Sequence, residues 1–340
     1  MAELVGFKKR GSEVRLLAPD DAELRARAEV AGIPTAPFND AKWRYPFEAV
    51  RLACWLRRIK PDVLNTHSSR DGWLVGMAGR LARVPLIVRT RHVDVGYSNP
   101  RISRHAFTTF ADLVLTTSDR ITAHLRETFQ LPAERVVTMP TGIDLSRFTP
   151  VGERADLGPA PVVGMLSVLR SWKGHALFLE AARLLVRDGF TCRFVIVGEG
   201  PGHAGILKMR SEFGLEDKVD LLGHREDVPE VLRGMDLLVI PSTAHEGVPQ
   251  VGLQALACEV PVIGSDVGGI PQIIRPKETG RIFSSGNAVA LPAAIREAFA
   301  QADEARRMAL AGRHLVVQHH SLEGMLDQLQ VLYGRYLPVA

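Results

Sequence analysis

Short apolar segments alternate with amphipathic helical segments along nearly the whole chain, and this alternation restricts the fold more than any other feature. The apolar segments are rich in Val, Ile and Leu and are bounded by polar or Gly- and Pro-containing turns, as buried strands are. Strands that alternate with helices at this spacing form βαβ units, whose strands lie parallel in a sheet covered by helices. We therefore predict an α/β fold with doubly wound, Rossmann-like sheets.

The alternation forms two series. They are separated by residues 140–161, which are rich in Pro and Gly and carry no periodic pattern. Such a stretch is typical of a linker between domains, and a chain of 340 residues is long enough for two domains of ordinary size. We expect a first domain over residues 1–150 and a second domain over residues 151–320.

The predicted elements are as follows. In the first series, strands are expected at residues 12–19, 34–38, 62–66, 85–89, 112–116 and 135–139, and helices at 2–10, 21–32, 46–59, 71–82, 101–110 and 119–129. In the second series, strands are expected at 162–168, 192–197, 219–222, 237–240, 261–265 and 280–283, and helices at 175–188, 202–213, 228–235, 288–301, 304–319 and 321–336, with a further helix that begins near residue 249.

Residues 236–258, DLLVIPSTAHEGVPQVGLQALAC, combine a strand, a turn and a helix. Proline is favoured at the first helical position, which predicts a helix start near Pro249. Free backbone N–H groups and the positive end of the helix dipole would then face an anion bound at this turn. The carboxylate of Glu246 would bind a hydroxyl-rich group beside that anion, such as a sugar. The predicted binding turn comprises Glu246, Gly247, Val248 and Pro249.

Two cations follow the first strand of the second series, in the segment VLRSWKG at residues 168–174. Ligands of open α/β sheets bind at the carboxyl ends of the strands, and Arg170 and Lys173 lie in such a loop. Arginine binds phosphate oxygens bidentately, and lysine acts as a point charge. A lone cation in a loop is usually just solvated, but the combination with Glu246 favours a diphosphate clamp.

The stretch around Glu246 resembles the E-x7-E signature of family 4 retaining glycosyltransferases, which have the GT-B fold of two Rossmann-like domains facing across a cleft. The resemblance covers nearly the whole chain. The linker is similar to the family's N-G-V-D-x-x-x-F connection, here Thr141-Gly142-Ile143-Asp144 and Phe148. The segment 321–336 resembles the family's terminal helix, which crosses back to the first domain. Residues 321–340 are therefore expected to complete domain 1–150, the acceptor side, and 151–320 to bind the nucleotide-sugar donor.

The resemblance implies a role for each matching residue. Arg170 and Lys173 match the residues that hold the donor's pyrophosphate. Gln254 stands at the second acidic position of the signature, which holds the ribose hydroxyls. Glutamine can still form hydrogen bonds there, but without the charge-assisted strength of a carboxylate. In the segment VRTRHVD, His92 resembles the active-site histidine that faces the transferred sugar, although an isolated histidine is more often structural.

Three further loops follow predicted strands. In GHRED (223–227), which matches the family's base-binding loop, His224 or Arg225 could stack on the nucleotide base. The turn VIVGEGPG resembles a dinucleotide fingerprint, but His203 stands where the third glycine would be, so its glycines are expected to be structural. The segment THSSRDG could contact the acceptor through His67, Ser68 and Arg70.

These features together predict a retaining glycosyltransferase. It would move a sugar from a nucleoside diphosphate sugar, expected to be a UDP-sugar, to a hydroxyl group of the acceptor. Arg170, Lys173 and the helix N-terminus would stabilise the charge on the departing diphosphate, and neither a metal nor another cofactor is expected. No second carboxylate opposite Glu246 stands out as a nucleophile. Two alternatives stay open, namely a GT-B nucleotide-sugar 2-epimerase and a sugar-nucleotide-binding protein without catalytic activity.

The charge is distributed unevenly. Residues 1–150 carry 23 Lys and Arg against 16 Asp and Glu, a net of +7, whereas the remainder carries 19 against 22, a net of −3. A basic first half suggests an anionic partner such as lipid headgroups, although an ordinary solvated surface explains the excess equally well. Aromatic residues do not interleave with the basic residues as on a nucleic-acid surface. The expected partners are therefore a glycan or lipid-linked acceptor of the cell envelope and an anionic membrane surface, not nucleic acid.

The remaining features concern the cellular location and the start of the chain. No apolar run approaches the ~20 residues that span a bilayer, and no secretory signal is visible. The three cysteines, Cys54, Cys192 and Cys258, are expected to be buried reduced thiols. We therefore expect a cytoplasmic protein, or one peripheral to the inner face of the cytoplasmic membrane. The strand and glycine-rich turn that usually open this family do not precede the first helix. We expect the sequence to be a fragment or to start at a wrong Met, which an upstream coding frame would test.

Overall fold

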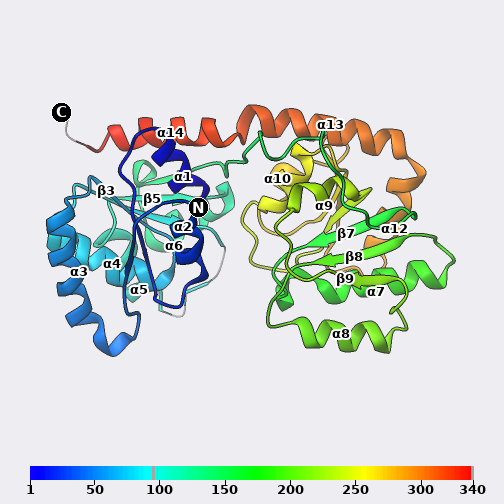
Figure 1. The fold of residues 1–340 in the computed structure, drawn as a ribbon, viewed down its shortest axis with the longest axis horizontal. Helices are drawn as coiled ribbons and strands as arrows, with labels where there is room; N and C mark the ends of the chain where they lie inside the picture. The colour runs from blue at the N-terminus through cyan, green and yellow to red at the C-terminus, as the bar shows by residue number, and fades with distance from the viewer. Residues whose placement is uncertain (94–95, 98, 338–340) are drawn as a thin grey trace. The chain divides into compact units, whose positions relative to one another are not determined.

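The computed structural model describes residues 1–93, 96, 97 and 99–337, and the chain divides into two compact units (Figure 1). Unit 1 contains Met1–Gly142 and Leu322–Ala340, and unit 2 contains Ile143–Ser321. The change of unit lies inside the Pro- and Gly-rich stretch 140–161, a few residues before the predicted boundary at 150. The reason is that Ile143 and Phe148 are buried in the core of unit 2.

Unit 1 is an α/β unit whose strands pair parallel in two separate sheets. Four strands form one sheet in the order β3-β4-β5-β6, and β1 pairs with β2 alone. The sequence predicts one parallel sheet, but among the described residues no strand pairs with both β1 and β3. The elements are α1 (Ala2–Lys9), β1 (Leu16–Ala18), α2 (Glu23–Val30), β2 (Thr35–Pro37), η1 (Lys42–Arg44), α3 (Tyr45–Ile59), β3 (Val63–Thr66), α4 (Ser69–Ala82), β4 (Leu86–Arg91), α5 (Pro100–Thr108), β5 (Leu113–Thr116), α6 (Asp119–Phe129), η2 (Ala133–Arg135), β6 (Val136–Thr138) and α14 (Leu322–Gly334).

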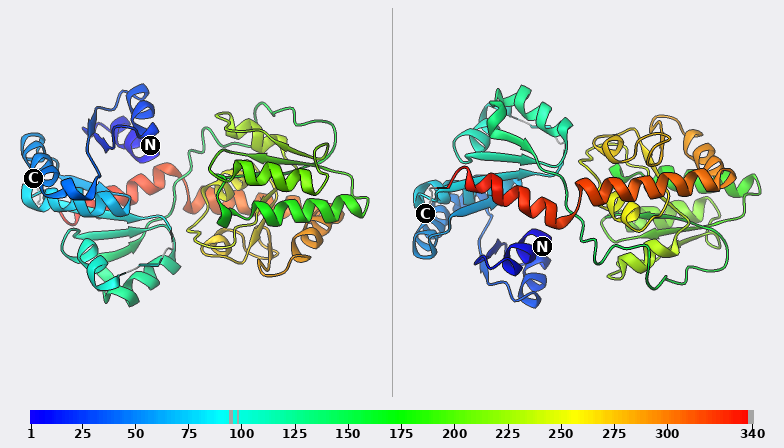
Figure 2. Two further views of the ribbon diagram at one scale, coloured as in Figure 1. Left: turned by 90° about the horizontal axis from the view of Figure 1, so that it is seen from below. Right: turned by 90° about the horizontal axis from the view of Figure 1, so that it is seen from above.

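Helices cover both faces of the four-stranded sheet of unit 1. In both views of Figure 2 the segment with α1 and α2 lies on one side of this unit, and α5 and α6 lie on the other. The terminal helix α14 packs against α1 and against the sheet, where Leu329, Leu332 and Tyr333 join Leu86 and Leu115 in one cluster. This packing explains why the last helix belongs to unit 1, as the resemblance implies.

Unit 2 contains a single six-stranded parallel sheet in the order β12-β11-β10-β7-β8-β9. This agrees with the predicted second doubly wound sheet. The elements are β7 (Val162–Leu166), η3 (Ser171–Lys173), α7 (His175–Arg187), β8 (Arg193–Val197), α8 (His203–Glu212), β9 (Val219–Leu221), α9 (Val228–Gly234), β10 (Leu237–Ile240), α10 (Gln250–Ala257), β11 (Val262–Ser265), α11 (Ile270–Ile273), β12 (Arg281–Phe283), α12 (Ala290–Ala300) and α13 (Ala302–His319).

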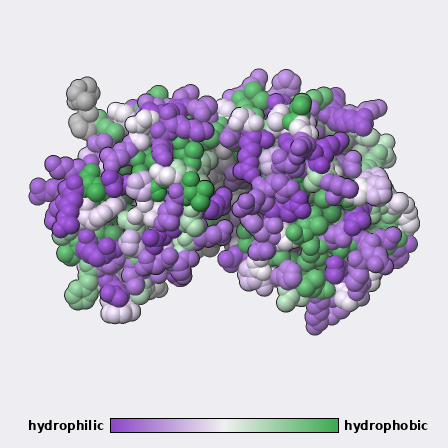
Figure 3. Space-filling model, in the orientation of Figure 1, coloured by the Kyte–Doolittle hydropathy of each residue, from purple (hydrophilic) through white to green (hydrophobic). Residues whose placement is uncertain are grey.

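Apolar side chains fill both faces of the unit 2 sheet, as expected for parallel strands covered by helices on both sides. On the face of the molecule that Figure 3 shows, both units are mostly hydrophilic, with hydrophobic patches of limited extent. The expectation of three buried thiols is correct for Cys192 and Cys258 and wrong for Cys54, which is exposed. Cys54 lies on the outer face of α3, because the inner face of that helix presents Leu52, Ala53 and Leu56 to the core.

Candidate functional site

The strand order of unit 2 reverses direction between β7 and β10. These strands are neighbours in the centre of the sheet, with Val163 beside Leu237. From β7 the chain continues to β8 on one side, and from β10 it continues to β11 on the other. The loops that follow β7 and β10 therefore leave the same sheet edge in opposite directions, which is where open α/β sheets bind ligands.

The loop after β7 is fixed to the loop after β10 by backbone contacts. The backbone N–H of Thr243 donates to the carbonyl oxygen of Trp172 at 2.8 Å. Gly174 has φ +81°, and a Cβ at this position would lie 1.8 Å from the carbonyl oxygen of Pro241. Only glycine combines this left-handed backbone with so close an approach. These contacts place Lys173 next to the turn that follows β10.

Lys173 and Glu246 form an ion pair at this edge. The Nζ of Lys173 lies 2.5 Å from Oε1 of Glu246, and the hydroxyl of Ser242 donates to the same oxygen at 2.6 Å. Glu246 is 6% exposed, so the carboxylate is desolvated and depends on these two donors. Ser242 is held in turn by the Ser265 hydroxyl, which donates to its carbonyl oxygen at 2.6 Å. The sequence interpretation did not include Ser242 or Ser265.

Arg170 lies in the same loop but has a different contact. Its guanidinium carbon is 5.3 Å from the centre of the Trp172 ring, and this ring meets His245 edge-on at 5.9 Å between centroids. The Arg170 side chain is exposed and makes no hydrogen bond to Lys173 or Glu246 among the described residues. The structure thus brings Lys173 and Glu246 together and places Arg170 on an aromatic ring of the same loop.

The helix after this turn begins one residue later than predicted. Pro249 is the N-cap, with φ −71° and ψ 118°, and α10 begins at Gln250. The extended ψ of Pro249 excludes it from the helix. The N-cap forms no side-chain hydrogen bond, so the first N–H groups of α10 keep their capacity to bind an anion. Gln254 is half-buried, about one turn from this end, and Gly247 and Val248 precede the cap.

His175 is buried against the loop that follows β7. It is 4% exposed, and its Nε2 lies 3.2 Å from the hydroxyl oxygen of Ser167. Burial lowers the pKa of His175 to about 4, although a hydrogen bond to the Arg170 backbone opposes this shift. The neutral ring therefore connects the start and the middle of the loop that carries Lys173. Its sequence signal, a histidine directly after Gly174 at a helix start, was not recognised.

The predicted base-binding loop follows β9. His224 is exposed, and its backbone N–H lies 3.4 Å from Oε1 of Glu199. Arg225 donates to both carboxylate oxygens of Asp227, at 2.7 and 2.5 Å. The hydrogen bonds raise the pKa of Arg225 and lower that of Asp227. The guanidinium is thus engaged by a carboxylate, whereas the ring of His224 is open to solvent. The glycine-rich turn after β8 contacts the loop that follows β7. The backbone N–H of Leu169 donates to the carbonyl oxygen of Glu199 at 2.9 Å.

In unit 1 the predicted histidine is one of a pair. Nδ1 of His67 lies 3.0 Å from Nε2 of His92, and the rings stack at 5.3 Å with an interplanar angle of 10°. His67 follows β3 and His92 follows β4, and these strands are neighbours. The sequence places both residues at strand ends but does not show that they form a pair. Asp94, the last residue of the VRTRHVD motif, lies outside the described residues.

Both histidines are exposed at the surface, but the protein atoms around each ring still disfavour its charged form. Burial lowers the pKa of His67, and burial followed by the charge of His67 lowers the pKa of His92 to about 4. The pair is therefore neutral at pH 7, with one ring as donor and the other as acceptor. Nearby, burial raises the pKa of Glu3, whose carboxylate lies 3.4 Å from Asn65 Nδ2 and 3.4 Å from the Tyr333 hydroxyl.

Arg89 and Arg91, the two arginines just before His92, each place the guanidinium group over an aromatic ring. Arg89 is 3% exposed, and its guanidinium carbon lies 4.3 Å from the centre of the Phe107 ring. Burial lowers the pKa of Arg89 to about 10. Arg91 lies over the Tyr97 ring at 5.2 Å. The structure thus assigns Arg89 to the interior of unit 1, not to a ligand-facing loop.

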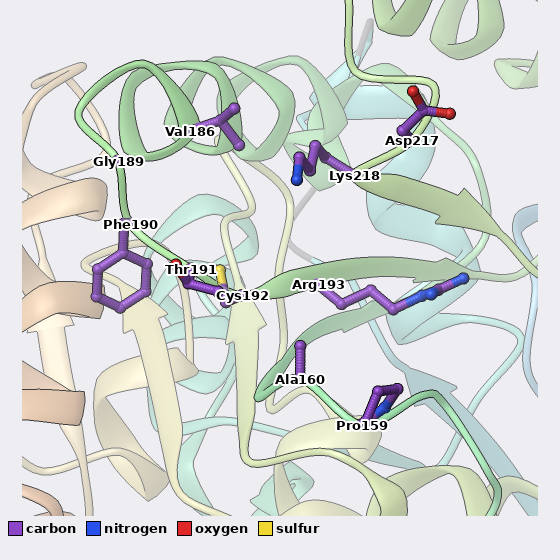
Figure 4. A pocket seen from close by; sticks show the side chains of 10 residues that line it. All are labelled: Pro159, Ala160, Val186, Gly189, Phe190, Thr191, Cys192, Arg193, Asp217 and Lys218. Atoms are coloured by element: carbon purple, nitrogen blue, oxygen red, sulfur yellow. The ribbon is translucent and has the colours of Figure 1, made fainter.

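A surface pocket of about 370 Å³ opens at the other edge of the unit 2 sheet. Figure 4 shows that it is lined by residues at the amino ends of β7, β8 and β9, among them Ala160, Cys192 and Lys218. Lys173 and Glu246 lie at the carboxyl ends, so this pocket is separate from the ion pair. In the part of the chain that is described, no group of three or more His, Cys, Asp or Glu could hold a metal ion, and no helix is long and apolar enough to cross a membrane.

Comparison with protein families gives two matches. Residues 154–315 match the family described as Glycosyl transferases group 1, and residues 4–147 match Glycosyltransferase Family 4. The first match lies within unit 2, and the second covers most of unit 1.

Individual proteins are also similar to this chain. The alpha-D-kanosaminyltransferase of Streptomyces kanamyceticus is 27% identical over 311 residues, which cover 82% of this chain and 79% of that protein. The UDP-Gal:alpha-D-GlcNAc-diphosphoundecaprenol alpha-1,3-galactosyltransferase of Escherichia coli is 30% identical over 258 residues, which cover 70% of this chain and 66% of that protein.

Two solved structures share the fold. A glycosyltransferase from Rickettsia africae ESF-5 has a TM-score of 0.86 at 20% identity, with 100% of this chain and 94% of that chain covered. Anabaena HepE, in complex with UDP and glucose, has a TM-score of 0.84 at 20% identity, with coverage of 97% and 95%.

Proposed function

Since this chain belongs to the group 1, family 4 glycosyltransferases and has the GT-B fold, we propose that it transfers a sugar from a UDP-sugar to a hydroxyl group of a cell-envelope glycan or lipid-linked acceptor. The reaction retains the anomeric configuration and uses no metal ion. The proposal assigns donor binding to unit 2 and acceptor binding to unit 1.

One observation carries the donor site, namely the ion pair of Lys173 with Glu246 in the turn that leads into α10, at the centre of the unit 2 sheet. A diphosphate needs cationic and N–H donors, and a sugar needs a hydroxyl acceptor. Lys173 and the first turn of α10 supply the donors. Oε1 of Glu246 accepts from Lys173 and Ser242, and the carboxylate's second oxygen is the acceptor that we assign to the sugar hydroxyls.

The chemistry follows from this placement. The bond between the anomeric carbon and the diphosphate oxygen breaks, and its electron pair moves to the diphosphate. Lys173, Arg170 and the N–H groups of α10 stabilise this charge without reorganisation. The acceptor oxygen bonds to the anomeric carbon on the face that the diphosphate leaves, and its proton passes to the diphosphate. Glu246 orients the sugar, and Gln254 binds the ribose hydroxyls.

The remaining contacts rest on matching motifs and location. We assign the nucleotide base to the loop with His224, which is exposed, in preference to Arg225, which is engaged by Asp227. His92 contacts the transferred sugar as a neutral hydrogen-bonding group. The acceptor class follows the name of the Escherichia coli relative, which acts on a diphosphoundecaprenol-linked sugar, and the excess positive charge of residues 1–150. An acceptor of this kind places the protein at the cytoplasmic face of a membrane.

The direct test is a thermal-shift screen of UDP-, GDP- and ADP-sugars, followed by product analysis with a lipid-linked diphosphate acceptor. We expect UDP-sugars to raise the melting temperature and the new glycosidic bond to keep the donor's anomeric configuration. An inverted product, or a shift with GDP- or ADP-sugars alone, would contradict the proposal. Incubation without acceptor excludes the epimerase alternative if the donor is recovered unchanged.

The position of Gln254 allows a second test. Gln254→Glu introduces a charged acceptor, and charge-assisted hydrogen bonds are about twice as strong as neutral ones. We therefore expect UDP to bind several-fold more tightly in calorimetry. Gln318→Glu, an exposed site on α13, is the matched control and should leave the affinity unchanged. Equal or weaker binding by Gln254→Glu would remove the ribose assignment.

A further inference from the structure

The outer face of α3 exposes three large apolar side chains in one row. Trp43, in the 3-10 turn before the helix, is 76% exposed, Phe47 is 78% exposed and Val50 is 58% exposed. The opposite face of the helix contains Leu52, Ala53 and Leu56, which are buried in the core of unit 1. Packing within the unit therefore explains the inner face and leaves the outer row exposed to solvent. The guanidinium carbon of Arg44 lies 5.3 Å from the centre of the Trp43 ring.

Helical geometry places this row in a single stripe. Within α3, at about 100° per residue, Phe47, Val50 and Cys54 fall within roughly 60° of one another, and Trp43 lies in the 3-10 turn that precedes the helix. Arg44, Arg51 and Arg58 recur at intervals of seven residues and form a cationic row along one side of the stripe. Arg57 lies on the other side.

The segment that carries this stripe is strongly basic. Residues 42–60 contain six Lys and Arg against one acid, Glu48. Glu48 is buried and accepts from Arg51 at 2.5 and 2.9 Å, so this pair is internally compensated. Arg44 and Arg58 form no ion pair among the described residues. Arg57 donates to the carbonyl oxygen of Leu81 at 2.6 Å and keeps its charge.

The stripe lies beside the proposed acceptor edge of unit 1. Asp40, in the loop that leads to α3, forms an ion pair with Arg70, in the first turn of α4. His67 directly precedes Ser68, the N-cap of that helix. α3 is labelled at the outside of unit 1 in Figure 1. A surface bound by this stripe would therefore be close to an acceptor held near His67 and Arg70.

We propose that the α3 stripe, residues Trp43, Phe47, Val50 and Cys54 with Arg44, Arg57 and Arg58, docks on the surface of an anionic lipid bilayer. Aromatic side chains enter the boundary between headgroups and acyl chains, and arginine stems lie along apolar surface while their guanidinium groups meet anionic headgroups. The inference rests on the proposed function in one respect, since a lipid-linked acceptor is held in a bilayer.

The test uses the full chain and vesicles of phosphatidylcholine with about 30 mol% phosphatidylglycerol, a content in the range where anionic lipids attract basic segments. We expect the protein to cosediment with these vesicles at low salt, to bind pure phosphatidylcholine weakly, and to dissociate as salt screens the charge. Phosphatidylcholine brominated on the acyl chain should quench the emission of Trp43. Trp43→Phe should abolish the quenching, because Trp55, Trp73 and Trp172 are half-buried.

Two pairs of variants separate the contributions. Arg44→Gln with Arg58→Gln should weaken partitioning about thirtyfold, from the attraction of each basic residue to an anionic surface. Trp43→Ala with Phe47→Ala should weaken it at least about tenfold. The controls are Lys208→Gln and Val289→Ala, exposed positions in unit 2, which should partition as the unchanged chain does. Thermal melts confirm that each variant is folded.

Three outcomes would overturn the inference: no partitioning, partitioning that both variant pairs leave unchanged, or quenching that persists in Trp43→Phe. Binding of the stripe to a second copy of the chain would also overturn the inference. In that case Trp43→Ala with Phe47→Ala would lower the molecular mass measured by sedimentation. UDP binding by calorimetry reports on unit 2 independently. Vesicle binding without sugar transfer would contradict the proposed function alone, and sugar transfer without vesicle binding would contradict the docking surface alone.

Discussion

Nζ of Lys173 lies 2.5 Å from Oε1 of Glu246, although the two residues are 73 positions apart and follow different strands. The contact exists because β7 and β10 are neighbours at the centre of the sheet. It gives the buried carboxylate a countercharge and holds an ammonium group at the turn that leads into α10. A donor diphosphate bound there would meet an ammonium group and N–H groups that are already in place.

Removal of the Lys173 ammonium should abolish most catalysis. We expect Lys173→Ala to lower kcat by a factor of about 100 or more, as for the loss of one electrostatic donor to a developing charge. Steady-state kinetics with a UDP-sugar measure the effect, and Lys208→Ala on α8 is the control. Since a buried carboxylate without its cation is destabilised, Lys173→Met with Glu246→Gln should regain stability without regaining activity. An unchanged kcat in Lys173→Ala would contradict the assignment.

Gly174 should tolerate no side chain, because its backbone is left-handed and faces the Pro241 carbonyl oxygen. Gly189 is the matched control, since its φ of +76° is similar to the +81° of Gly174 but a Cβ there meets nothing within 4 Å. Gly189→Ala should cost about 1–2 kcal/mol of unfolding free energy from backbone strain alone. Gly174→Ala should cost more and should also lower kcat, because Lys173 moves from Glu246. Equal losses of stability with full activity in both variants would show that the loop is not held by this contact.

His92 should stay neutral well below pH 6. NMR titration of the assigned His92 ring should give a midpoint of about 4, because burial and the adjacent His67 disfavour its protonation. His67→Ala should raise this midpoint, because it lets water reach the His92 ring and removes a neighbour whose protonated form would repel the charged His92. The midpoint of His175 in unit 2, also about 4, should not change. A His92 midpoint near the ordinary 6.5 would contradict the desolvated pair.

His175 should make the stability of the protein depend on pH. Its folded pKa of about 4 lies below the ordinary value of 6.5, so between these values the unfolded state binds more protons and acid favours unfolding. The contribution is fully present above pH 6.5 and is lost as the pH falls towards 4. Between pH 7 and pH 5 we expect a loss of about 2 kcal/mol that His175→Gln lacks. Urea unfolding of both proteins at the two pH values measures the difference, and parallel losses would exclude this role.

Local sequence patterns predicted the elements of the fold closely. The strand Leu237–Ile240 and the helix Asp119–Phe129 have their predicted bounds, because apolar periodicity and capping residues are properties of adjacent positions. The short helix α11 and the first residue of α10 were missed, because four residues carry no period and Pro249 suits both a cap and a first turn.

The sequence alone determined that this chain forms parallel α/β units, that residues 140–161 contain the connection between them, and that Lys173 and Glu246 lie at carboxyl strand ends. Tertiary structure decided which of these ends meet. It paired Lys173 with Glu246, added the Ser242 hydroxyl as a second donor to that carboxylate, placed His67 against His92, buried Arg89 and left Trp43 exposed. The physical reason is that secondary structure follows from neighbours along the chain, whereas contacts and burial depend on strand order and on helix packing between distant segments.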